Sequence, residues 1–173
     1  YDSWPGFGLV SISDHQRLPI RNGNWLATVP HGLPARAYDF RAEPAGDYLA
    51  FLGRVSPEKG LENAIRIALQ AGMPLKIAAK VDTADRIYFE AHIKPLLAQP
   101  SIEFIGEISD AQKSDFIGNA RALLFPIRWP EPFGLVMIEA MACGTPVIAF
   151  ERGAVAEVLE NGVSGFIVKS EDE

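Results

Sequence analysis

Two glutamates eight residues apart, Glu131 and Glu139, lie in the stretch EPFGLVMIEAMACG. Methionine, isoleucine and alanine surround Glu139, and the helix predicted here is apolar on every face. Such a helix is normally buried, and a buried carboxylate is unfavourable unless a hydrogen-bond donor or a cation satisfies it. Glu139 therefore needs either a ligand that donates hydrogen bonds or an ion pair, for which Arg54 and Lys59 are the candidate cations.

The segment PIRWPEPFG, residues 126–134, leads into this helix and has the composition of an anion site. Pro132 and Gly134 predict that the helix begins near Phe133 or Gly134, where free backbone N–H groups and the helix dipole favour an anion. Gly134 also permits close approach of a ligand to the backbone. Glu131 lies just before the helix, where a lone glutamate more often compensates the helix dipole than binds a ligand.

The turn LGRVSPEKG, residues 52–60, supplies positive charge. Its helix is predicted to begin near Pro57 or Glu58. Arg54 has the planar geometry that grips phosphate oxygens in pairs, and Lys59 offers a point charge. Taken alone, this pattern favours a structural interpretation, in which Arg54 pairs with a carboxylate and Lys59 is solvated.

Short apolar runs that alternate with helical periodicity must position these turns. The pairs AG at 71–72, CG at 143–144 and NG at 161–162 are helix-ending signals, and Gly153 is predicted to open one more helix. Strands that alternate with helices predict a doubly wound parallel α/β sheet of Rossmann-like type, in which ligands bind beyond the carboxyl ends of the strands. The expected strands are 48–52, 75–79, 102–105, 122–125, 146–150 and 165–168.

The first part of the chain has a different pattern. Residues 8–13 and 25–30 predict two further strands, and the following segment is rich in Pro, Gly and Ala without periodicity. We therefore expect residues 1–30 to be the end of a preceding N-terminal domain or accessory strands, and 31–45 to be a linker. Residues 46–173 then form the Rossmann-like domain. The start at YDSWPGFG and the end at SEDE suggest a piece of a longer protein.

Composition narrows the function classes. The 173 residues are 48% hydrophobic and carry a net charge of −6, so a folded core is expected and nucleic acid is not an expected partner. The single Cys143 excludes an internal disulfide, and no Cys/His spacing indicates a metal site. No apolar run reaches membrane-spanning length, and a cytoplasmic location is expected. His15, His31 and His92 share no catalytic pattern, and Trp129 is interpreted as loop packing.

Together these stretches resemble the C-terminal domain of retaining GT-B glycosyltransferases, the family-four group also described as glycosyl transferases group 1. The resemblance covers roughly residues 46–170. It depends on four segments in family order: GRVSPEKG at 53–60, FIGEIS at 104–109, PIRWPEPFGLVMIEAMACGTPVIAF at 126–150 and EVLENGVSGFIV at 157–168.

The resemblance implies roles for ten residues. The position of Glu139 accepts hydrogen bonds from the ribose hydroxyls of the donor nucleotide, and the position of Glu131 lies by the donor sugar. Arg54 and Lys59 neutralise the diphosphate, whose stabilisation as leaving group is the main catalytic task. Where many members carry a glycine-rich turn, this chain has AAKVDTAD at 78–85, so Lys80 is expected to replace it. The remaining donor-site positions are Gly53, Ile108, Phe133, Gly134 and Leu135.

The resemblance also implies a hexose transferred with retention from a nucleotide-diphosphate sugar, without a bound cofactor or a side-chain metal site. UDP is favoured over GDP as the nucleotide. The acceptor loop of the family belongs to the N-terminal domain, which is the expected partner in the full-length protein, and no membrane contact is expected from this half. Two alternatives stay open: a non-catalytic nucleotide-binding domain, and a GT-B nucleotide-sugar epimerase.

Overall fold

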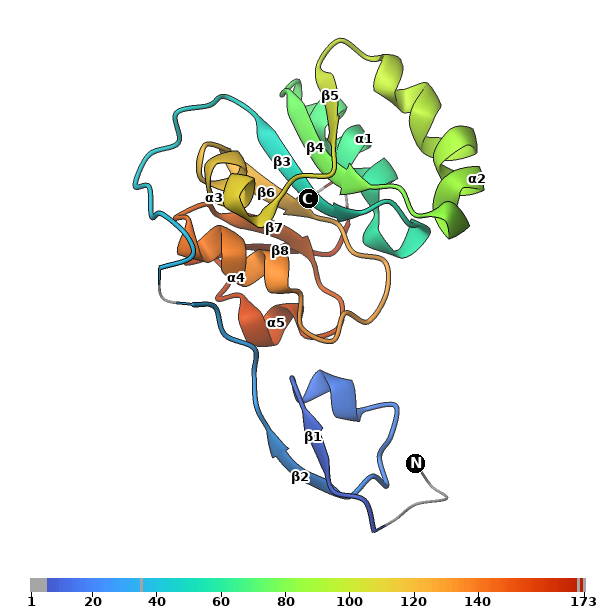
Figure 1. Cartoon of the computed structure of the whole chain (residues 1–173), viewed down its shortest axis with the longest axis vertical. Coiled ribbons are helices and arrows are strands. Elements are labelled where there is room, and N and C mark those ends of the chain that lie inside the picture. The colour runs from blue at the N-terminus through green and yellow to red at the C-terminus, as the bar shows by residue number, and fades with distance from the viewer. Residues whose placement is uncertain (1–5, 35, 171, 173) are drawn as a thin grey trace.

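Six parallel strands form the central sheet of the protein, which is described here by a computed structural model of residues 6–34, 36–170 and 172. The strand order is β5-β4-β3-β6-β7-β8, which confirms the doubly wound α/β architecture (Figure 1). The strands are β3 Leu49–Arg54, β4 Leu75–Lys80, β5 Ile102–Gly106, β6 Ala122–Phe125, β7 Val147–Phe150 and β8 Gly165–Val168.

All six predicted strands are present, but β3 and β4 are longer than their apolar runs. The two strands pair residue by residue as far as Gly53 with Ala79 and Arg54 with Lys80. The prediction that Gly53, Arg54 and Lys80 lie in turns is therefore wrong. Backbone hydrogen bonds continue the ladder past the last apolar side chain, where hydrophobic patterning gives no signal.

Helices cover both faces of the sheet. Because side chains alternate along a strand, Leu49 and Phe51 pack with α1 (Leu61–Ala71) on one face. Tyr48 and Ala50 point to the opposite core. On that second face, Figure 1 shows three helices side by side: α3 Asp110–Gly118, α4 Leu135–Ala142 and α5 Val155–Val158.

Glycines with positive φ set the starts of two helices, α1 and α4. Gly60 has φ 72°, so a 3-10 turn at Pro57–Lys59 precedes α1 instead of one helix that begins at Pro57. Gly134 is the N-cap of α4, as predicted. The prediction that Asn161 and Gly162 end a helix is wrong, because α5 is one turn long and Leu159 is already extended, with a side chain 4% exposed in the core.

The crossover between β4 and β5 has mixed helical geometry. A 3-10 turn at Thr83–Asp85 leads into α2 (Arg86–Tyr88), a π-type turn at Phe89–Ile93 and a 3-10 turn at Lys94–Ala98. Ile93 is fully buried and joins the core of the α1 face. The segment therefore completes the layer on that side of the sheet.

The N-terminal part forms a separate two-stranded parallel sheet, β1 (Leu9–Ser11) with β2 (Trp25–Thr28), joined by a 3-10 turn at His15–Arg17. An extended segment then leads to β3 (Figure 1), and its described residues contain no strand or helix. Residues 1–5 of the predicted 1–30 unit lie outside the described residues. None of the helices described is long and apolar enough to cross a membrane.

Candidate functional site

The strand order creates a switch point between β3 and β6. The chain adds β4 and β5 on one side of β3, then returns to the other side with β6, β7 and β8. β3 and β6 pair only at Leu49 with Ala122 and at Ala50 with Leu123, so their carboxyl halves are not paired with each other. A pocket of about 650 Å³ lies at this point, where open α/β sheets bind their ligands.

The N-terminus of α4 opens into this pocket. Gly134 has φ 84°, and a Cβ at that position would lie 2.6 Å from Cε of Met137. Among the described residues, no acceptor is recorded for the backbone N–H groups of Phe133, Gly134 or Leu135. These free donors and the helix dipole make an anion site against the backbone.

Two loops that are distant in sequence dock against each other beside the pocket. A Cβ at Gly60 would lie 2.0 Å from the carbonyl oxygen of Pro126, so only glycine allows this approach. The N–H of Arg128 donates to the carbonyl of Glu58 at 2.8 Å. The docking places the 52–60 turn directly against the segment that carries Glu131.

Lys59 and Trp129 both donate to one oxygen of Glu131. The distance to Oε2 is 2.7 Å from Nζ of Lys59 and 2.9 Å from Nε1 of Trp129. The Glu131 side chain is only 10% exposed, and Nζ of Lys59 lies 5.5 Å from the centroid of the Trp129 ring. The interpretation of Lys59 as solvated is therefore wrong, because loop docking makes this lysine a partner of a buried carboxylate. Trp129 packs within its own loop and donates to Glu131 two residues away.

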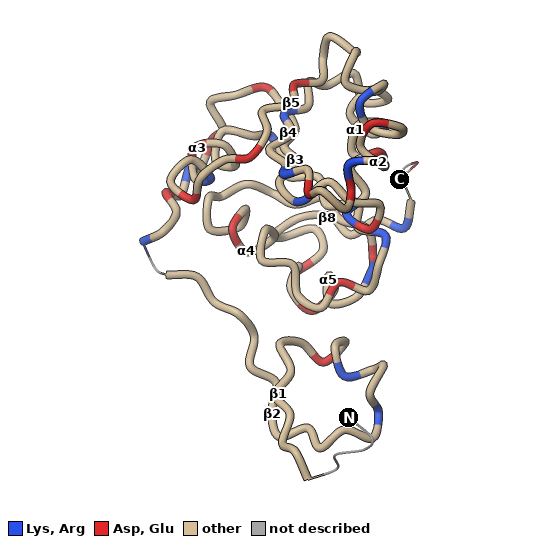
Figure 2. The backbone as a smooth tube through the Cα atoms, turned by 45° about the vertical axis from the view of Figure 1, so that its right-hand side comes forward, with Lys and Arg blue, Asp and Glu red and all other residues tan. Residues whose placement is uncertain are grey.

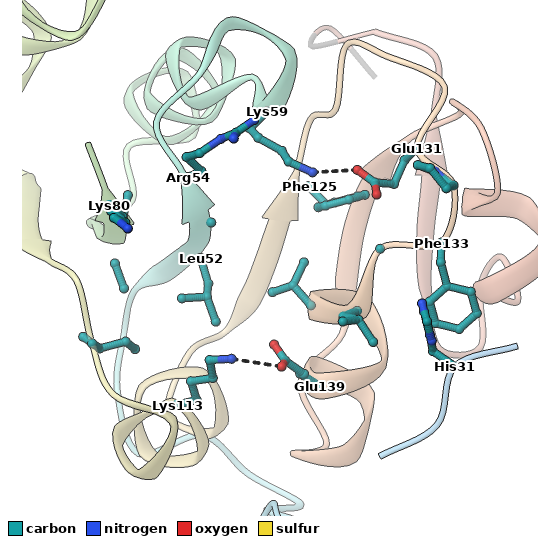
Figure 3. Close-up of a pocket in the computed structure, with 18 of the residues that line it drawn as sticks. His31, Leu52, Arg54, Lys59, Lys80, Lys113, Phe125, Glu131, Phe133 and Glu139 are labelled. Atoms are coloured by element: carbon teal, nitrogen blue, oxygen red, sulfur yellow. Dashed lines mark hydrogen bonds and ion pairs between the residues drawn. The ribbon is translucent and has the colours of Figure 1, made fainter. Parts of the chain in front are cut away.

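Glu139 lies at the opposite side of the pocket and pairs with a residue that the sequence did not indicate. Nζ of Lys113, from the first turns of α3, donates to Oε1 of Glu139 at 3.2 Å (Figure 3). The expectation that Arg54 or Lys59 would be the ion-pair partner is wrong, since those residues come from the far wall. Its position could have indicated Lys113 as a site residue, because it follows the N-cap Ser109 by four residues and helix starts at this edge of the sheet face the site.

Burial and charge shift two pKa values around Glu139. Burial alone would lower the pKa of the Lys113 ammonium, but the hydrogen bond to Asp110 and the interaction with Glu139 outweigh it and raise that pKa. The pKa of the Tyr38 hydroxyl is also raised, first by burial and then by its hydrogen bond to Glu139 and the charge of that carboxylate. Lys113 is therefore charged and Tyr38 neutral at pH 7.

Arg54 and Lys80 lie side by side at the ends of β3 and β4, where carboxylates surround them. Arg54 donates to Glu58 at 2.8 Å and has Asp82 and Asp85 at 3.9 and 4.0 Å. Lys80 pairs with Asp82 at 3.3 Å. The structure thus shows Arg54 paired with carboxylates, as its structural interpretation predicted, although both side chains are about half exposed and line the pocket.

The pocket brings together all ten residues singled out from the sequence. They are Gly53, Arg54, Lys59, Lys80, Ile108, Glu131, Phe133, Gly134, Leu135 and Glu139. The sequence missed Lys113, and it set aside Trp129 and His31. The ring of His31 meets that of Phe133 edge-on at 5.1 Å between centroids. Within the described parts of the chain, no group of three His, Cys, Asp or Glu side chains is arranged to hold a metal ion.

Figure 2 shows how the charged residues are distributed along the chain, with both signs on the strands and helices around the switch point. Positive and negative side chains also face each other across the lining of the pocket. Lys59 faces Glu131 and Lys113 faces Glu139, with the α4 N-terminus between the two pairs (Figure 3). The site can therefore offer cations and free N–H groups to a phosphate, and carboxylates to hydroxyl groups.

Comparisons with known proteins identify relatives of this chain and solved structures that share its fold. Phosphatidyl-myo-inositol mannosyltransferase of Mycobacterium leprae is 39% identical over 95% of the chain and 46% of its own length. Sucrose-phosphate synthase from Thermosynechococcus elongatus superposes with a TM-score of 0.81 at 24% identity, over 95% of this chain and 46% of that one. The Anabaena protein HepE, in complex with UDP and glucose, gives 0.80 at 23% identity, over 92% and 48%.

At this identity the two solved structures bear on the fold alone, which is the Rossmann-like sheet of one half of a GT-B fold. The chain spans less than half the length of each of the three proteins. The family model described as glycosyl transferases group 1 matches residues 40–173, which is most of the sequence. The chain therefore belongs to the glycosyl transferases group 1 family.

Proposed function

We propose that this chain is the donor-binding half of a retaining glycosyltransferase that transfers a hexose from a nucleotide-diphosphate sugar. One observation carries the proposal: the free N-terminus of α4 lies between the Lys59–Glu131 pair and the Lys113–Glu139 pair in a single pocket. A diphosphate needs donors and positive charge, and a sugar or ribose needs carboxylates that accept from hydroxyls. The three features match the three parts of such a donor.

In this proposal the diphosphate lies against the backbone N–H groups of Phe133, Gly134 and Leu135. Lys59 is close enough to share its ammonium between Glu131 and a phosphate oxygen, because an ammonium has three donors. Arg54 and Lys80 reach the same region once their exposed carboxylate partners exchange for phosphate. Positive charge held where the leaving diphosphate develops its negative charge lowers the barrier to transfer.

The two carboxylates bind the hydroxyl-bearing ends of the donor. Glu139 accepts hydrogen bonds from the ribose, and Glu131 accepts from the donor sugar with Oε1, for which the described residues provide no donor. UDP is the favoured nucleotide because the similar Anabaena protein was solved with UDP and glucose. The preceding half of the full-length protein supplies the acceptor side, which fits a β1–β2 sheet that leaves Val10, Leu26 and Val29 more than half exposed.

A ligand panel in thermal unfolding tests this proposal. We expect UDP to raise the melting temperature more than uridine does, because a ligand that binds the folded state stabilises it by linkage and most of the affinity comes from the diphosphate. GDP serves as the comparison for the base. Equal shifts from UDP and uridine would contradict a diphosphate site at α4.

The matched pair of variants is Lys59→Met and Lys94→Met. Lys94 forms an exposed ion pair with Glu90 outside the pocket, so its variant should keep the full UDP shift. Lys59→Met should lose most of the difference between UDP and uridine. A loss of the same size in both variants would show only a general charge effect.

A further inference from the structure

Glu139 is held from outside its own helix by Lys113. The carboxylate is 8% exposed within α4, yet its Oε1 accepts a hydrogen bond from an ammonium on the neighbouring helix α3 at 3.2 Å. A glutamate side chain has three torsions, so a glutamate in a pocket wall has several rotamers open to it. An ion pair from a second element selects one of them.

Lys113 is itself held by a second carboxylate. The same Nζ also lies 3.0 Å from Asp110, so both contacts are made by the ammonium end. The side chain of Asp110 is 95% exposed, while that of Lys113 is 23% exposed. The start of α3 is set by a capping box between Ser109 and Gln112. The ammonium is therefore held between a carboxylate in solvent and a buried one, on a helix whose first turn is well defined.

The Glu139 carboxylate keeps room for a ligand. A carboxylate has about four lone-pair sites on its two oxygens. Lys113 donates to Oε1, which leaves other sites for ligand hydroxyls. Lys113 therefore does not saturate the group it orients.

We infer that Lys113 is a positioning residue that sets the Glu139 carboxylate for ribose recognition, and so determines the preference of the site for ribonucleotides over deoxynucleotides. The inference depends on the proposed function, since it assigns the ribose to Glu139. A purely structural cation would stabilise the fold and leave that preference unchanged. A measurement of selectivity for ribose therefore distinguishes a positioning role of Lys113 from a structural one, whereas a measurement of stability does not.

The experiment measures the affinity of the full 173-residue chain for UDP and for 2′,3′-dideoxy-UDP by calorimetry. Wild type should bind UDP more tightly by about tenfold or more, the scale of a hydrogen bond to a charged group. Lys113→Met should lower the UDP affinity and leave the dideoxy affinity unchanged, so that the ratio falls to within about threefold. Lys113→Arg should retain most of the ratio, because it keeps the cation.

Lys76→Met is the matched control. Lys76 pairs with Glu103 on the sheet, outside the pocket, and its variant should keep the wild-type ratio. If Lys113→Met folds poorly, Asp110→Asn releases the ammonium from its solvent-side anchor without altering a buried group, and should lower the ratio in part. The inference would be overturned if Lys113→Met left the ratio of UDP to dideoxy-UDP affinity unchanged, which includes an equal loss of affinity for both ligands. If only Asp110→Asn can be measured, an unchanged ratio in that variant would overturn it.

Glu139→Gln separates this inference from the proposed function. If Glu139→Gln leaves the ratio unchanged, the ribose role of Glu139 itself is wrong. If Glu139→Gln lowers the ratio and Lys113→Met does not, only the positioning role of Lys113 fails.

Discussion

Nζ of Lys59 and Oε2 of Glu131 lie 2.7 Å apart although 72 residues separate them in the sequence. The cation expected to hold the donor diphosphate is therefore paired with the carboxylate expected to hold the donor sugar. The pair keeps a negative charge tolerable in the pocket wall. It also places both groups together on one wall of the pocket.

Replacing Lys59 with methionine should destabilise the free protein. The change leaves the Glu131 carboxylate with Trp129 as its remaining donor. We expect a loss of about 1–3 kcal/mol in the free energy of unfolding, less than for a fully buried pair because the Lys59 side chain is 25% exposed. Urea unfolding at pH 7 measures it, and Lys94→Met at an exposed pair should cost less than about 1 kcal/mol.

The double variant Lys59→Met with Glu131→Gln checks the cause. Removing both charges should recover much of the loss, since no uncompensated charge remains. If the double variant is less stable than Lys59→Met alone, the uncompensated charge of Glu131 is not the origin of the stability loss.

Gly53→Ala should separate ligand binding from folding. A Cβ at Gly53 would meet nothing closer than the Phe51 ring at 3.7 Å, and Gly53 lines the pocket on β3. Alanine suits a strand better than glycine, so we expect stability to be unchanged or higher by up to about 1 kcal/mol. UDP affinity should fall because a methyl group enters the space beside the backbone.

Gly72→Ala provides the opposite pattern as a control. Gly72 has φ 65° at the end of α1, outside the pocket, with no atom near its Cβ position. Its variant should lose stability through backbone strain and keep the intrinsic UDP affinity. Unchanged UDP affinity in Gly53→Ala would mean that no part of the donor approaches β3 at this point.

Tyr38→Phe should flatten the alkaline limb of the stability curve. Burial and the hydrogen bond to Glu139 raise the pKa of Tyr38 in the folded state. Between the unfolded pKa, about 10, and the higher folded value, only the unfolded chain loses this proton, so stability falls as pH rises. Unfolding free energies of wild type and Tyr38→Phe, measured from pH 7 to 11, should differ by a constant amount up to about pH 9 and converge above about pH 10.

The neutral hydroxyl contributes the same amount at every pH of the lower range, so a constant offset there is the internal reference. Parallel curves across the whole range would contradict the assignment, because they would mean that Tyr38 titrates alike in both states.

The 173-residue chain alone should bind the donor without transferring sugar. In the proposed enzyme the acceptor and part of the sugar pocket come from a facing half, and closing that cleft provides orientation and excludes water. Such effects are valued at roughly 7–11 kcal/mol at most. We expect at most slow donor hydrolysis in a UDP-release assay. Adding the separately expressed preceding half should restore transfer, whereas full turnover by this chain alone would mean that the catalytic groups are misplaced here.

The sequence, with the family resemblance that it carries, determined the architecture and ten of the residues that line the pocket. A buried strand needs apolar side chains, so its own short stretch of sequence identifies it. All six central strands were predicted in this way. The start of α4 followed from Gly134 and Pro132, since few residues other than glycine adopt a positive φ. Parallel pairing then brings every strand end to one edge, so residues chosen for their chemistry converge there.

Only the tertiary structure decided which side chains meet. Lys59 reaches Glu131 because Gly60 lets its turn touch the carbonyl of Pro126, and Glu139 meets Lys113 because α3 packs beside α4. Neither contact has a local signal, since an ion pair depends on how two separate loops or helices dock. The extension of β3 through Arg54 has the same origin, because the partner strand β4, rather than the local sequence, provides the hydrogen bonds.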